Sequence, residues 1–190
     1  MSEIQVNTIN EYTGANGVTI DGVLIKDGEV DGVDVSSITQ GITVADQWRM
    51  TADQATNGTL TNWSQVTDSG TGTIGSSMTQ SSGTFTFPST GIYLVTLMAN
   101  GQTSNNVTTA NIYVTTDNSA YNLEVAMNFL TNNSITTYQT MTGSLIVDVT
   151  DTSLVKVRFN FNGSDGTNDV IFGTTGVNET SATFLKLGET

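Results

Sequence analysis

The chain has 190 residues, of which 36% are apolar, and it carries 18 acidic against 5 basic residues, a formal charge of -13. This length suits one domain with an extension, or two small domains. Without a basic stripe to neutralise phosphates, the charge argues against nucleic acid and anionic membrane surfaces as partners. Because Cys and His are both absent, disulfides, Cys/His zinc sites and Ser-His-Asp or Cys-His relays are excluded.

Residues 1–43 form a region of their own, with Tyr12 as the only aromatic residue. Three Asp-Gly steps divide this region into very short pieces, and such steps are typical of tight turns. Between them, Val23-Leu24-Ile25 is apolar on both faces of an extended chain. Because so short a segment rarely buries enough surface to fold alone, we expect a trimeric stem in which each copy packs against two neighbours. The steps begin at Asp21, Asp27 and Asp31.

Residues 44–190 have the pattern of an all-β domain. Thr, Val, Ile and aromatic residues dominate, turn residues recur about every ten positions, and helical periodicity is almost absent. Phe85 and Phe87 share one face of a strand, and the following stretch GIYLVTLMA is apolar on both faces and therefore central. The pattern predicts an antiparallel jelly-roll β-sandwich of roughly eight to ten strands.

Neither an export signal nor a membrane segment is expected. The segment MSEIQVNTIN lacks the basic and apolar regions of a signal peptide. The longest apolar stretch, GIYLVTLMA, is far too short to span a bilayer. The absence of Cys fits a reducing cytoplasm and an exposed particle surface equally well.

Two segments carry predictions about individual side chains. In the loop-rich segment 51–84, a few apolar residues are the only candidates for core contacts: Leu60, Trp63, Val66, Ile74 and Met78. In the segment YNLEVAMNF, alternation places Glu124 on the outer, solvent-exposed face and the apolar residues on the opposite face. These apolar residues are Leu123, Val125, Met127 and Phe129.

The stretch GTFTFPSTGIYLVTLMA resembles a motif of the complement-type, tumour-necrosis-factor-like jelly rolls. The family pattern Phe-x-x-Pro-x-x-Gly-x-Tyr-x-Val is matched by Phe85, Pro88, Gly91, Tyr93 and Val95. Later, SLIVDVTDTSLVKVRF resembles the family hairpin, with Thr150-Asp151 where the family has Gly-Asp, and SATFLKL resembles its closing strand. The resemblance covers about residues 45–188. Each matched residue has a mechanical role: Pro88 ends a strand, Gly91 permits a tight turn, and Tyr93 packs its ring while its hydroxyl finds a partner.

This resemblance implies a homotrimer. Members of the family associate through the faces of their jelly rolls, with aromatic and aliphatic side chains at the threefold axis. The candidates for axis positions are Tyr113, Tyr121, Tyr138 and Phe161. For each of them a place in the monomer core is the alternative interpretation.

Motifs for chemistry are weak in this chain. The stretch GTGTIG (70–75) has the spacing of a dinucleotide-binding loop but lacks the preceding strand and following helix. The stretch DGEVDG (27–32) begins like an EF-hand loop, yet Ile38 occupies the position of its bidentate Glu. Calcium held by copies of Asp27, Asp31 or Asp34 at a trimer axis is an alternative to solvated turns, as it is for the loop 162–169. We expect no catalytic residue and no cofactor.

The segment NTINEYTGANGVTIDGVLIKDG resembles the anchoring segments of tail-fibre and head-fibre proteins of marine tailed bacteriophages, over about residues 4–35. This resemblance implies a virion protein: a homotrimeric short fibre or decoration protein, attached to the capsid through residues 1–43, with residues 44–190 as its knob. The alternative is a tail-fibre module whose knob binds host surface glycans. Trp63 could stack on a sugar ring there, but the favoured interpretation is that Trp63 pins its loop onto the sandwich. A glycan-degrading tailspike is disfavoured, because neither a long parallel β-helix nor clustered acids are visible.

Overall fold

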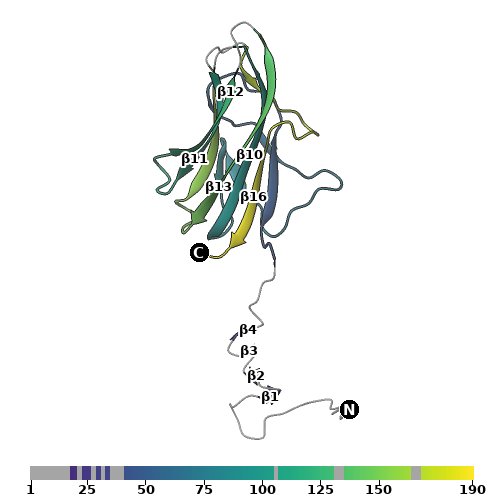
Figure 1. The fold of residues 1–190 in the computed structure, drawn as a ribbon, viewed down its shortest axis with the longest axis vertical. Helices are drawn as coiled ribbons and strands as arrows, with labels where there is room; N and C mark the ends of the chain where they lie inside the picture. Colours follow the sequence, from purple (N-terminus) through teal and green to yellow (C-terminus); the bar gives the residue numbers. More distant parts are fainter. Residues whose placement is uncertain are drawn as a thin grey trace. The chain divides into compact units, whose positions relative to one another are not determined.

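The computed structural model describes residues 41–104, 107–130, 135–163 and 168–190, together with the backbone of four short strands before residue 35. The chain divides into two compact units, Met1–Gly41 and Ile42–Thr190. All the regular secondary structure in the described residues is β-strand (Figure 1). The predicted all-β class is therefore confirmed.

The first unit contains a small antiparallel sheet whose strands follow one another in chain order. It consists of β1 (Val18–Ile20), β2 (Val23–Lys26), β3 (Glu29–Val30) and β4 (Val33–Asp34). Ile20 pairs with Val23, and Lys26 pairs with Glu29. The short pieces between the Asp-Gly steps are strands, while the steps themselves lie outside the described residues and the trimeric stem stays a prediction.

The second unit is a sandwich of two six-stranded antiparallel sheets. Sheet 1 has the order β13-β10-β16-β5-β7, with β15 paired to β10, and sheet 2 has the order β12-β11-β14-β9-β8, with β6 paired to β14. Sheet 1 comprises β5 (Ala45–Met50), β7 (Trp63–Gln65), β10 (Gly91–Thr103), β13 (Thr137–Val149), β15 (Val170–Ile171) and β16 (Ser181–Gly188). Sheet 2 comprises β6 (Gly58–Thr59), β8 (Thr79–Ser81), β9 (Thr84–Thr86), β11 (Val107–Thr115), β12 (Asn122–Leu130) and β14 (Lys156–Asn162).

The described strands outnumber the roughly eight to ten that alternation predicts. The excess consists of strands of two or three residues, β6, β7 and β8. Pieces this short carry no readable alternation. The long strands, by contrast, follow the prediction, and β10 is central because β13 and β16 flank it.

An aromatic cluster fills the space between the sheets. Phe85, Phe159 and Phe184 are fully buried, and the ring centroid of Phe85 lies 5.5 Å from that of Phe159 and 5.1 Å from that of Phe184. Phe87 is buried as well, so the shared face of Phe85 and Phe87 is confirmed. Phe161 has no exposed surface and belongs to this core, which excludes it from a trimer axis.

The residues of the family motif have the expected roles. Gly91 has a φ of 139° at the start of β10. The Tyr93 ring is fully buried against Phe87, with centroids 4.8 Å apart. Its hydroxyl lies 2.9 Å from Ser89 Oγ and donates to Ser89 O at 3.1 Å. Pro88 follows the end of β9, where it need not donate to a ladder.

A β-bulge in β12 corrects the prediction for Leu123. Ile112 pairs with Val125 but the next residue, Tyr113, pairs with Leu123, so Glu124 is the extra residue. Beyond the bulge the alternation is shifted by one position. Leu123 therefore leaves the buried face and is 50% exposed, whereas Met127 and Phe129 are buried as predicted.

The segment 51–84 is held down at several points. Leu60, Trp63, Val66 and Met78 are buried as predicted, but Ile74 is 49% exposed. Ile74 serves instead through its backbone, which exchanges two hydrogen bonds with Ala45. Because this contact involves no side chain, apolarity gives no indication of it.

Candidate functional site

The outer face of sheet 1 carries an uncovered group of aliphatic side chains. Along β10 every second side chain points inward and is buried, and those between them are half-buried on the outer face. Leu94 lies opposite Ile146 on β13 and opposite Leu185 on β16, which brings three aliphatic side chains side by side. Ile92 is the next outward residue of β10. We call Ile92, Leu94, Ile146 and Leu185 the aliphatic patch.

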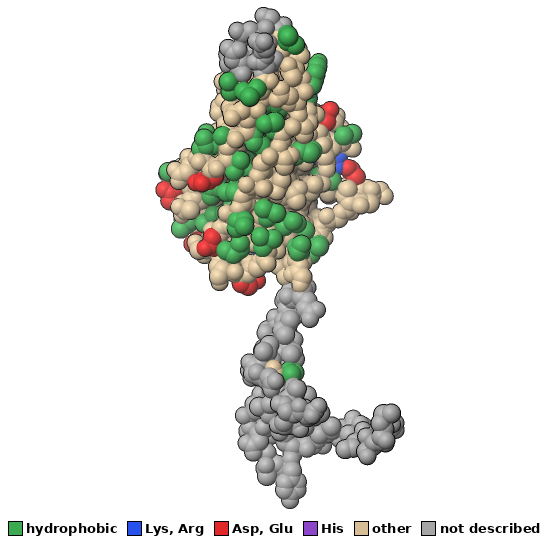
Figure 2. Space-filling model, in the orientation of Figure 1, with side chains coloured by type: hydrophobic (Ala, Val, Ile, Leu, Met, Phe, Trp, Pro, Cys, Tyr) green, Lys and Arg blue, Asp and Glu red, His purple; other side chains and the backbone are tan. Residues whose placement is uncertain are grey.

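The aliphatic patch is open to solvent in the single chain. Ile146 is 65% exposed, and the other three side chains are half-buried. Leu187, at a register shift between β10 and β16, is 52% exposed near the same end of the sheet. In the space-filling view, hydrophobic side chains gather over the part of the sandwich where β13, β10 and β16 run in Figure 1 (Figure 2). A contiguous apolar group of this kind is typical of an interaction surface.

Further apolar side chains are exposed along the strands at one edge of the sandwich. β12 and β13 are the first strands of their sheets and contact each other there. Gly143 of β13 allows this closeness, since a Cβ at Gly143 would lie 2.8 Å from Val125 Cγ1 and 2.9 Å from Met127 Sδ. Beyond this contact the edge exposes Leu123 at 50%, Leu130 at 60%, Ile135 at 61% and Tyr138 at 69%. We call these four residues the apolar edge.

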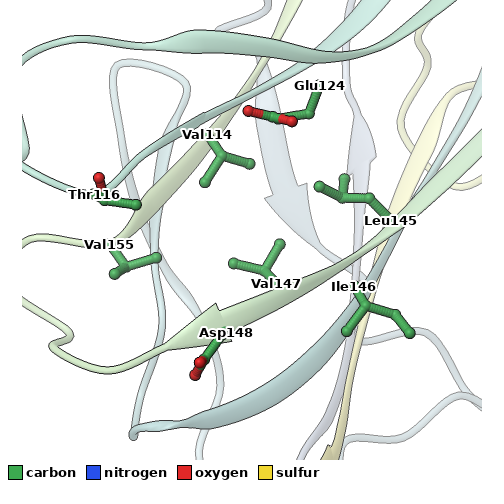
Figure 3. A pocket seen from close by; sticks show the side chains of 8 residues that line it. All are labelled: Val114, Thr116, Glu124, Leu145, Ile146, Val147, Asp148 and Val155. Carbon is green, nitrogen blue, oxygen red and sulfur yellow. The ribbon is translucent and has the colours of Figure 1, made fainter.

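A pocket of about 240 Å³ opens between β12 and β13. Its aliphatic lining comes from Val114, Leu145, Ile146, Val147 and Val155. Figure 3 shows Glu124 and Asp148 on opposite sides of these side chains, Glu124 from the bulge of β12 and Asp148 from β13. Glu124 is solvent-exposed as predicted, but it stands beside this pocket because of the bulge. The pocket thus joins the aliphatic patch, through Ile146, to the sandwich edge.

The structure separates the residues predicted for a trimer axis. Tyr138 projects from β13 at the apolar edge, where its ring stacks on Phe172 with centroids 6.0 Å apart. Tyr113 and Tyr121 instead lie with Arg158 of sheet 2. Of the four candidates, only Tyr138 belongs to the apolar edge.

Trp63 is not available to a sugar. It is 7% exposed, its ring packs edge-on against Phe85 at 5.6 Å, and its Nε1 donates to Leu60 O at 2.8 Å. The favoured interpretation, that Trp63 pins its loop onto the sandwich, is confirmed, and the other, that it stacks on a sugar ring, is wrong.

Calcium at the predicted positions is not tested. Asp27, Asp31 and the residues 164–167 lie outside the described residues, and of Asp34 only the backbone is described. Within the described ranges, no three acidic side chains gather closely enough to hold a metal ion together. The stretch 70–75 is followed by β8 and by no helix in the described chain, which agrees with its interpretation as a loop. No helix in the described part of the chain could cross a membrane.

The fold is that of the tumour-necrosis-factor-like jelly rolls. Eiger TNF from S. frugiperda superposes with a TM-score of 0.62 at 10% identity, over 79% of this chain and 96% of that one. Murine APRIL, in a crystal structure at pH 8.0, superposes with a TM-score of 0.55 at 9% identity, over 76% of this chain and 98% of that one. No protein-family pattern matches the sequence. No curated protein matches it either.

The aliphatic patch was only partly visible in the sequence. Because GIYLVTLMA is apolar on both faces, Leu94 is expected to pack against other residues, but the pattern does not identify them. Ile146 and Leu185 come from strands far away in the sequence, and only the register of β10 with β13 and β16 brings them together. The pocket depends on the bulge at Glu124, for which the sequence has no signal.

Proposed function

We propose that this protein is a non-enzymatic homotrimer whose sandwich forms a knob. The aliphatic patch is the observation that carries the proposal, since Ile92, Leu94, Ile146 and Leu185 form an apolar surface that a single chain leaves in water. Burying such side chains stabilises an assembly by about 25 cal/mol for each Å² removed from water. The fold shared with the TNF proteins supports this arrangement without establishing it.

The shape of the apolar surface favours a ring over a twofold dimer. A twofold contact needs one patch that is complementary to itself. Here the apolar residues lie on a sheet face and on an adjoining edge, which are two different surfaces. The apolar edge of one copy can pack on the aliphatic patch of the next. Such head-to-tail contacts leave no apolar surface uncovered once the copies form a closed ring. We propose that three copies close the ring.

We further propose that the protein is a component of a tailed-phage virion, assembled in the host cytoplasm. Its role would be that of a short fibre or decoration protein anchored to the capsid through residues 1–43, which would form the trimeric stem. Support for this comes from the resemblance of about residues 4–35 to phage anchoring segments and from the separate compactness of Met1–Gly41.

Light scattering of the full chain tests the trimer. We expect a mass near three times 20.1 kDa. Ile146→Asp should convert the trimer to a folded monomer, because it places a charge in the centre of the aliphatic patch. The control is Val177→Asp, the same change at a residue that is 60% exposed and outside both apolar surfaces.

A monodisperse monomer of the unmodified chain would contradict the proposal. A stable trimer of the Ile146→Asp variant would contradict the assigned interface. Circular dichroism of both variants separates loss of assembly from loss of folding.

Particle assembly tests the virion role. A chain that lacks residues 1–43 should be absent from particles purified from an infection supplied only with that chain, while the intact chain is incorporated. Incorporation of both forms would count against the anchor. Copy number then separates two locations, because hundreds of copies per particle indicate the head and a few dozen at most indicate the tail.

A further inference from the structure

The outer face of sheet 2 carries two cations that have no carboxylate partner in the part of the chain that the structure describes. Lys156 and Arg158 follow each other on the outer side of β14. The two ion pairs found in the described residues belong to Arg49 with Asp68 and to Lys186 with Glu189. Among the described residues, Lys156 Nζ donates to Thr86 Oγ1 alone, at 2.9 Å. In a chain of net charge -13, cations that no neighbouring acid neutralises call for another explanation.

Aromatic rings hold Arg158 in place. Its guanidinium carbon lies 3.9 Å from the centroid of the Tyr121 ring and 5.6 Å from that of Tyr113, its cross-strand neighbour on β11. Tyr121 follows a loop that Asp117 Oδ1 closes by accepting hydrogen bonds from Ser119 N and Ala120 N. Stacking fixes the plane of a guanidinium and leaves its edge free to bind a carboxylate in a fork.

Two side-chain polar atoms on this face are buried and have no hydrogen-bond partner among the described residues. They are Arg158 Nε and Asn111 Oδ1. Asn111 is 3% exposed and lies on the same outer face as Tyr113, two residues before it on β11. Such atoms are costly to leave unpaired. One is a donor and the other an acceptor, so a single ligand that offers both kinds of group would satisfy them once the side chains that cover them move aside.

The chemistry of these groups selects the ligand. Lys156 and Arg158 require an anion, Asn111 Oδ1 requires a hydroxyl donor, and the Tyr113 ring suits the apolar face of a sugar. Outward residues on a strand are spaced by about 6.6 Å, so these groups span roughly the length of one or two sugar rings. The acidic remainder of the chain repels a long polyanion, whereas a single carboxylate meets mainly the local cations within a Debye length of about 8 Å.

We propose that the outer face of sheet 2 binds a carboxylate-bearing sugar, such as a uronic acid residue of a surface glycan. Arg158 and Lys156 hold the carboxylate, Asn111 accepts from a ring hydroxyl, and Tyr113 contacts the ring. The site lies on the sheet opposite the aliphatic patch and does not require the chain to trimerise.

Saturation-transfer NMR on the full chain tests this site. The probes are methyl glucuronide and methyl glucoside, which differ only in the carboxylate. We expect transfer to the glucuronide and little to the glucoside. Arg158→Gln should weaken glucuronide binding by about tenfold or more, since a charge-assisted hydrogen bond contributes at least about that factor to binding. Val177→Asp serves as the control that leaves binding unchanged.

Three outcomes would overturn the proposal. They are no transfer to the glucuronide, equal transfer to both sugars, and unchanged binding in the Arg158→Gln variant. Preferential binding of heparin, with a steep salt dependence, would also overturn it in favour of a polyanion site. Light scattering of Arg158→Gln should still show the unmodified oligomeric state, so a failure of this inference is distinguishable from a failure of the proposed trimer.

Discussion

Single residues with special backbone or hydrogen-bond geometry decide how the long strands begin and end. Gly91 starts β10 with a φ of 139°, a conformation that residues with a Cβ rarely adopt. Space is also lacking there, because a Cβ would lie 2.3 Å from Lys186 Cε and 2.6 Å from Gly188 O. Asp117 has a comparable role in the loop between β11 and β12, where it organises the turn before Tyr121.

Gly91→Ala should destabilise the sandwich by about 2 kcal/mol, since it combines a strained backbone with a contact to a backbone oxygen. Urea unfolding followed by tryptophan fluorescence measures this change. Gly72→Ala is the matched control, because nothing lies within 4 Å of a Cβ at that position. Its effect should stay within about 0.5 kcal/mol. An equal loss in both variants would contradict the role of Gly91.

Asp117 should titrate below the ordinary range of aspartate. The hydrogen bond from the Thr115 hydroxyl, followed by those from Ser119 N and Ala120 N, lowers the pKa of its carboxyl group. A depressed pKa means that these bonds stabilise the loop above the ordinary aspartate pKa and are lost as the pH falls through the lowered value. Carbon-detected NMR titration measures the midpoint. Thr115→Val should raise it, and an unchanged midpoint would contradict the assigned cause.

At the scale of elements, one buried carboxylate is among the contacts that hold the segment 51–84 on the sandwich. Asp46 of β5 is 2% exposed and accepts hydrogen bonds from Trp48 Nε1 at 2.8 Å, Gln65 Nε2 at 3.0 Å and Met78 N at 2.8 Å. These donors lie on three separate stretches of the chain. Asp46 therefore holds β5, β7 and the start of β8 together.

Asp46→Ala should cost about 3 kcal/mol of stability, because it leaves Trp48 Nε1 and Met78 N without their acceptor, whereas Gln65 Nε2 keeps its bonds to Thr73 and Ser77. The loss should be local first, so that the amide of Met78 exchanges with deuterium far faster than the amides of β10 do. Glu179→Ala is the control, since its carboxylate makes no hydrogen bond in the described residues. Uniform acceleration across the sandwich would contradict a local role.

How well a strand can be predicted from the sequence depends on its length. Alternation identifies Phe85 with Phe87 and the central position of β10, since these depend on neighbours in sequence. It fails at Leu123, because a bulge shifts the pattern without any sign in the side chains. It also cannot bring Arg158 to Tyr113 or Ile146 to Leu94, because these contacts depend on which strands pair and in what register. The candidate sites were therefore less predictable than the strands that carry them.

At the scale of the whole molecule, the two units differ in how they could be stable. The sandwich has one continuous core of buried aromatic and aliphatic residues. The sheet of the first unit, by contrast, consists of strands of two to four residues. A small sheet of such strands is marginal in water unless it packs against something else.

A chain that begins at Ile42 should therefore fold on its own. We expect the same cooperative unfolding transition by circular dichroism as for the sandwich in the full chain, with a midpoint within a few degrees. Loss of the transition on truncation would show that the first unit contributes to the core of the second.

The chain enters and leaves the sandwich at the same end. Ala45 of β5 pairs with Leu185 of β16, and Lys186 N donates to Val44 O at 2.9 Å. A short linker from Thr190 to Ile42 would therefore close the domain into a circle, and new ends could be opened at the exposed turn Thr175–Gly176. Such a circular permutant would keep every pair of strands while it moves the point of attachment. The sandwich could then be attached to another protein either through Ile42, as in the native chain, or through the turn Thr175–Gly176, as in the permutant.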